Sequence, residues 1–141
     1  MLNHAETVKF VFNFHSAGKM MVTPLNGDLP RTLKSKFPDI YDIFAEFSND
    51  VAFPDQTDIG PVSETADLEV GGSAGDWIVN ELHIPAVEPE IGRFQDIEDW
   101  FPKTDKIAFQ LATDQVNMIN YAADKIGNQI SLEAIGYKII K

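Results

Sequence analysis

The chain has 141 residues, a formal net charge of −11 and no cysteine. The absence of cysteine excludes disulfides, thiolate nucleophiles and cysteine-ligated metal sites. Apolar residues make up 44% and charged residues 23%, which is the composition of a globular protein rather than a disordered one. The sequence shows no apolar run near the roughly 20 residues of a membrane span and no signal-peptide pattern. We therefore expect a single domain over residues 1–141, soluble and cytoplasmic, without membrane contact.

The negative charge is concentrated in the middle of the chain. Residues 41–100 hold fifteen acids and one base, Arg93, and so carry a net charge of −14. Residues 1–40 carry +2 and residues 101–141 carry +1. An acidic surface of this strength repels phosphates, so we expect no direct nucleic-acid binding. It attracts basic proteins or cations, and a solvated face that only maintains solubility is the alternative.

The first third of the chain has the pattern of a hairpin followed by helices. Residues 7–14 place apolar side chains at every second position, which predicts a strand. A glycine-containing turn and residues 20–25 then predict a second strand that pairs with it. Apolar residues at helical spacing predict helices near 29–36 and 38–48, with Pro38 in the first turn of the second.

The middle of the chain predicts one clear helix start. Residues 49–72 are rich in glycine, proline and acids and predict an irregular connection. Ser73 and Asp76 have the spacing of a capping box, so a helix should begin there and run through Trp77.

The last third predicts β-structure. Apolar residues alternate in 106–113 and 116–123, and shorter apolar segments follow to the end of the chain, which is typical of an antiparallel meander. The fold class expected from the whole pattern is α+β. It comprises an N-terminal β-hairpin, two to four short helices and a C-terminal antiparallel β-meander, with the helices packed on one face of the sheet.

The segment G-G-S-A-G around Ser73 matches the nucleophile turn of α/β-hydrolases, G-x-S-x-G. That turn needs a buried apolar strand before the serine and a histidine downstream that can reach it. Here the preceding residues alternate between polar and apolar, and the one downstream histidine, His83, lies in the same predicted helix. We therefore expect Ser73 to cap a helix rather than to act as a nucleophile.

Other chemistries lack parts in the sequence. The three histidines are far apart and match no metal-binding spacing. Asp55, Asp58 and Glu64 are oxygen ligands of the kind calcium accepts, but they do not follow a known loop pattern, and solvated acids are the alternative. Phosphate-binding glycine loops are missing. We therefore predict no catalytic residue, no metal and no cofactor.

These observations favour a non-enzymatic acidic binding protein. The concrete hypothesis is an immunity protein that neutralises a basic, nuclease-like toxin by occluding its cationic surface. The alternatives are a phage or mobile-element inhibitor that mimics nucleic-acid charge, a small enzyme or cation-binding protein that uses a carboxylate site, and a structural subunit that self-associates. The expected partner-binding residues are Asp55, Asp58, Glu64, Asp67, Glu69 and Trp77. Trp77 or Trp100 is the candidate aromatic anchor, and packing of both tryptophans into the core is the favoured alternative.

Overall fold

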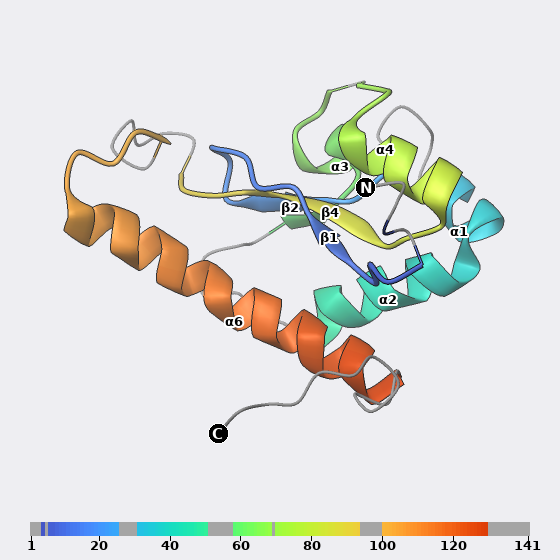
Figure 1. Cartoon of the computed structure of the whole chain (residues 1–141). Helices are drawn as coiled ribbons and strands as arrows, with labels where there is room; N and C mark the ends of the chain where they lie inside the picture. The colour runs from blue at the N-terminus through green and yellow to red at the C-terminus, as the bar shows by residue number, and fades with distance from the viewer. Residues whose placement is uncertain are drawn as a thin grey trace.

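One mixed sheet with helices on both sides forms the body of the protein (Figure 1). The computed structural model describes residues 4, 6–25, 31–50, 58–68, 70–93 and 100–129. The strands are β1 (Val11–Phe12), β2 (Met20–Val22), β3 (Asp58–Gly60) and β4 (Ala86–Glu90). The helical segments are α1 (Arg31–Lys36), α2 (Pro38–Asp50), α3 (Val62–Thr65), α4 (Ala74–Trp77), the π-helical turn η2 (Ile78–Leu82) and α6 (Asp105–Gln129).

The order of the strands is β1-β4-β2-β3. β4 pairs in parallel with β1 and antiparallel with β2, and β2 pairs in parallel with β3. The N-terminal hairpin predicted from the sequence is therefore wrong. The two strands form as elements, but β4 lies between them, with Val11 opposite Ala86 on one side and Val22 opposite Glu88 on the other.

Pro89 explains why the sequence did not predict β4. A proline argues against a central strand because it has no N–H for the ladder. The backbone N–H groups of Val11, Asn13 and His15 donate to the carbonyls of Pro85, Val87 and Pro89, so these positions of β4 face β1. The missing N–H of Pro89 therefore falls on the β1 side and interrupts that ladder at one position. Pairing continues beyond it, because the Ile91 N–H donates to the His15 carbonyl. On the other side the ladder with β2 continues through Glu88 and Glu90.

The predicted C-terminal meander is also wrong in the part of the chain that is described. Residues 106–113 and 116–123 both belong to α6, a helix of 25 residues. Ile107, Leu111, Met118 and Ala122 have helical spacing and form its inner face, with Met118 and Ala122 fully buried. Short alternating apolar runs fit either a strand or a helix with two apolar faces, and tertiary packing decides between them. The expected strands beyond Gln129 lie outside the described residues.

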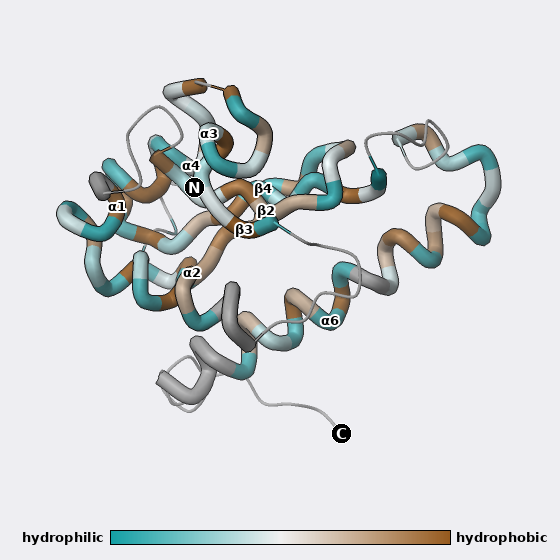
Figure 2. The backbone as a smooth tube through the Cα atoms, turned by 180° about the vertical axis from the view of Figure 1, so that it is seen from behind, coloured by the Kyte–Doolittle hydropathy of each residue, from teal (hydrophilic) through white to brown (hydrophobic). Residues whose placement is uncertain are grey.

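The helices cover both sides of the sheet, in contrast to the expected single face. α2 and α6 lie on one side, and α3 and α4 lie on the other, in both views (Figure 1, Figure 2). The core includes Ile40 and Phe44 of α2, Ile78 and Val79 of η2, and Val87 of β4. Pro38 begins α2 as predicted, and α1 falls within its predicted range. The described part of the expected irregular segment 49–72 contains β3 and α3, each too short to show a periodic pattern.

Candidate functional site

The start of α4 is built around two reciprocal hydrogen bonds. The Ser73 hydroxyl accepts from the Asp76 N–H at 3.1 Å, and the Asp76 carboxylate accepts from the Ser73 N–H at 3.2 Å. This is the capping box expected from the sequence. His83 lies 3.0 Å from the Asp39 carboxylate at the start of α2. Ser73 therefore has the predicted role of a helix cap, and His83 is paired elsewhere.

Asp76 also fixes the backbone around the helix start. Its side chain is buried, and besides Ser73 it accepts from the N–H of Gly72 at 2.9 Å and from the N–H of Leu25. Gly72 has φ +78°, a conformation that favours glycine. Leu25 also has a positive φ, +65°, and its N–H bond to Asp76 holds it in place. One carboxylate thus joins the segment after β2 to the start of α4.

Glu88 anchors the same helix to the sheet. Its side chain is buried in the centre of β4, and Oε1 accepts from the Gly75 N–H at 3.1 Å and from the Asn13 amide at 3.3 Å. An acid at a helix N-terminus is stabilised by the orphan N–H groups there. Two of the acids counted in the −14 segment are therefore internal structural groups, not part of an outer charged surface.

Trp77 lies beside a groove on the outer side of α4. The groove has a volume of about 530 Å³ and is lined by Leu25, Gly71, Gly72, Asp76, Trp77, Asn80 and Glu81. Trp77 is 45% exposed, while Gly75, Asp76, Ile78 and Val79 around it are buried. Packing into the core, the alternative considered for Trp77, is therefore wrong. A large aromatic side chain held on a rigid element beside a groove is a common feature of protein-binding surfaces.

The segment that leads into the groove at Gly71 also exposes apolar side chains. Leu68 and Val70, in the segment that joins α3 to α4, are 55% and 46% exposed. Three exposed acids accompany them. We call this surface the α3–α4 face, and its members are Glu64, Asp67, Leu68, Val70, Trp77 and Glu81. Both α3 and α4 lie on the same side of the sheet (Figure 1).

The structure brings three of the predicted contact residues into this surface. Glu64, Asp67 and Trp77 are members of it, and Asp58 is exposed at the start of the edge strand β3, which leads directly into α3. Asp55 and Glu69 lie outside the described residues. Sequence reasoning missed Leu68, Val70 and Glu81. The signal available in the sequence was a pair of aliphatic residues, Leu68 and Val70, in a predicted loop just before Gly71-Gly72. A loop does not need aliphatic side chains to pack against the core.

The acidic segment 41–100 does not form one face. Asp42 and Glu46 are exposed on α2, which lies on the opposite side of the sheet from α3 (Figure 1). Asp76 and Glu88 are internal. The exposed acids of the α3–α4 face are Glu64, Asp67 and Glu81.

A second polar group lies at the edge of the sheet. The Asn13 amide nitrogen is 2.9 Å from His15 Nε2, and His15 Nδ1 is 3.7 Å from Glu90 Oε1. Partial burial raises the pKa of Glu90; the charge of His15 opposes this rise and that of Glu88 adds to it. Asn13 links this pair to Glu88 and the α4 anchor, which is a structural role.

No known protein-family model matches the sequence, and no curated protein matches it as a relative. Among the residues that the structure describes, no group of three or more histidine or acidic side chains is arranged to hold a metal ion. Within the same residues, no helix combines the length and the apolar character that a membrane span requires.

Proposed function

We propose that this chain is a non-enzymatic binding protein whose α3–α4 face occludes a basic surface of a partner protein. The observation that carries the proposal is Trp77, which is half exposed beside a groove although its neighbours on the helix are buried. Interface hot spots are enriched in tryptophan, and they lie in pockets that the partner closes to water. A partner's lysine or arginine side chain fits such a site, because the indole face attracts cations and Glu81 lies in the same groove.

Electrostatics supports a basic partner. The protein carries −11 overall, and the face includes three exposed acids, Glu64, Asp67 and Glu81. Complementary charge accelerates association and excludes acidic competitors, while the apolar centre supplies affinity. An immunity protein against a nuclease-like toxin is the concrete form of this proposal, since an enzyme that binds phosphates presents a cationic surface. An inhibitor from a phage or mobile element that mimics nucleic-acid charge would use the same surface.

The test is capture of partners from native-host lysate on the tagged protein, with washes of increasing salt. We expect one basic protein to be retained at low salt and released as salt rises. Replacement of Trp77 by alanine should weaken its binding at least about tenfold, which is the effect of removing a hot-spot aromatic residue.

A matched pair of triple variants separates the face from net charge. One variant carries Glu64→Gln, Asp67→Asn and Glu81→Gln, and the other carries Glu6→Gln, Asp42→Asn and Asp124→Asn. All six acids are exposed, so both variants lose three negative charges. The first should lose far more affinity than the second. Equal losses would mean that the partner senses only net charge, and the assignment of the α3–α4 face would then be wrong.

A further inference from the structure

α6 carries a second apolar face, which is exposed. Its inner face packs through Met118 and Ala122. On the opposite side, Phe109 is 73% exposed, Val116 is 49% exposed and Ile119 is 40% exposed. Phe109, Ala112, Val116 and Ile119 are three or four residues apart, so they form one stripe along the helix. Figure 2 shows hydrophobic segments repeated along the length of α6.

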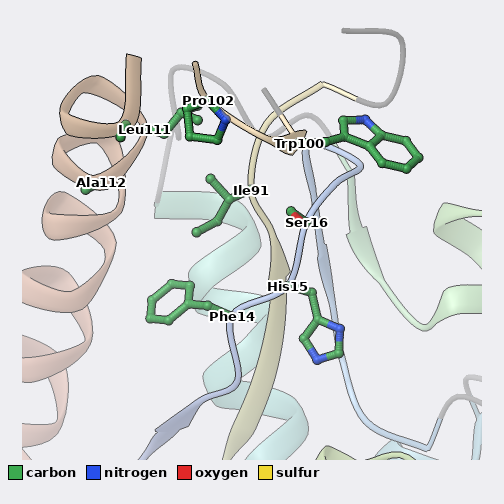
Figure 3. A pocket seen from close by; sticks show the side chains of 9 residues that line it. Phe14, His15, Ser16, Ile91, Trp100, Pro102, Leu111 and Ala112 are labelled. Carbon is green, nitrogen blue, oxygen red and sulfur yellow. The ribbon is translucent and has the colours of Figure 1, made fainter. Parts of the chain in front are cut away.

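The stripe continues into an apolar groove. The groove has a volume of about 600 Å³ and lies between the N-terminal half of α6 and the ends of the β1 and β4 segments. Phe14 and Ile91 point toward α6, while His15 points away from it (Figure 3). Ala112 belongs to both the stripe and the groove lining, so the two form one surface. We call it the α6 surface.

The α6 surface is nearly free of charge on a strongly acidic molecule. Of the described residues that line the groove, only His15 is titratable. The whole of α6 carries a net charge of −1, whereas the chain carries −11. A basic partner would be drawn to the acids elsewhere. Two molecules that each carry −11, in contrast, repel each other least where their surfaces hold the least charge.

We propose that the α6 surface is a self-association interface, which a second copy of this chain covers in a two-fold dimer. A two-fold interface presents the same patch on both subunits, so a protruding side chain and an acceptor groove must occur together on one surface. Phe109 and the groove beside it meet this requirement. The small residues Ala108 and Ala112 allow another helix to approach closely.

The experiment is sedimentation velocity from low to high micromolar protein, at low and at high salt. We expect a concentration-dependent dimer whose dissociation constant falls as salt rises, because salt screens the repulsion between acidic copies. Binding of a basic partner has the opposite salt dependence, so the two proposals can fail independently. Phe109→Glu should raise the dissociation constant at least about thirtyfold, since each dimer would bury the new charge twice. Val116→Glu should act in the same direction.

Asn117→Glu is the matched control. Asn117 is exposed on the same helix but outside the stripe, and the substitution adds the same charge. The Asn117→Glu protein should dimerise with a dissociation constant close to that of the wild type. Circular dichroism should show wild-type helix content for all three variants. A protein that stays monomeric at every concentration and salt level would overturn the proposal. So would an Asn117→Glu variant that dissociates as readily as Phe109→Glu.

Discussion

Asp76 holds three backbone N–H groups, and its removal tests how the Trp77 groove is built. Asp76→Ala leaves the N–H groups of Leu25, Gly72 and Ser73 without this acceptor. Leu25 is buried, so its donor loses a partner that water cannot replace, at a cost of about 1–3 kcal/mol. Gly72 is exposed and Ser73 half-buried, so water can replace much of what they lose. The other half of the capping box, in which the Ser73 hydroxyl accepts from the backbone N–H of residue 76, is retained.

We therefore expect Asp76→Ala to lower the free energy of unfolding by about 1–3 kcal/mol, mainly through the Leu25 donor. Ser73→Ala removes only the bond from the serine hydroxyl to the Asp76 N–H, so it should cost about 1 kcal/mol. Asp42→Ala, an exposed acid on α2, should change stability by no more than about 0.5 kcal/mol.

Urea unfolding followed by circular dichroism and tryptophan fluorescence measures these differences. The order of loss should be Asp76→Ala, then Ser73→Ala, then Asp42→Ala. An Asp76→Ala variant no less stable than Ser73→Ala would refute the reasoning, because it would mean that the buried Leu25 donor has no need of the carboxylate.

Four further substitutions test α6 and the titratable pairs. In a helix Val116 and Met118 face opposite sides, whereas in a strand they would share one side. Met118 is buried, so Met118→Ala should cost about 2–4 kcal/mol of unfolding free energy, and Val116→Ala should cost far less. Equal losses for the two variants would contradict the helix. Burial raises the pKa of Glu90, with His15 opposing, so Glu90→Gln should be more stable than wild type at pH 7. That gain in stability should shrink as pH falls through the raised pKa, because the wild-type carboxyl becomes protonated. The urea midpoint of unfolding, measured for both proteins at several pH values, tests this, and a gain that does not change with pH would contradict it. Slight burial acts to raise the pKa of Asp39, but hydrogen bonds from the His83 side chain and the Ile40 backbone, together with the charge of His83, lower it. The small stability that this carboxylate adds is present above its ordinary pKa and is lost as pH falls through the lowered value, so Asp39→Asn should flatten the acid side of the stability–pH curve.

The sequence by itself determined the elements whose signals are local. α1, α2 and the capping box of Ser73 and Asp76 follow from apolar periodicity, from a proline that suits a first helical turn, and from side-chain spacing that satisfies nearby N–H groups. It also assigned Ser73 to capping, and it selected Glu64, Asp67 and Trp77, each of which is exposed in the structure.

Only the tertiary structure decided how these elements pair and which of their faces are buried. β4 carries Pro89 and lies between β1 and β2, a position that no local pattern indicates. Whether a strand can include a proline depends on which neighbouring strand faces the missing N–H, and the sequence alone does not show that neighbour. The alternation in residues 106–123 fits a strand or a helix with two apolar faces, and burial of Met118 and Ala122 selected the helix. Charge counts could not separate Asp76 and Glu88, which hold backbone N–H groups inside the fold, from the acids that face solvent. Burial depends on neighbours distant in the chain, and the sequence does not list those neighbours.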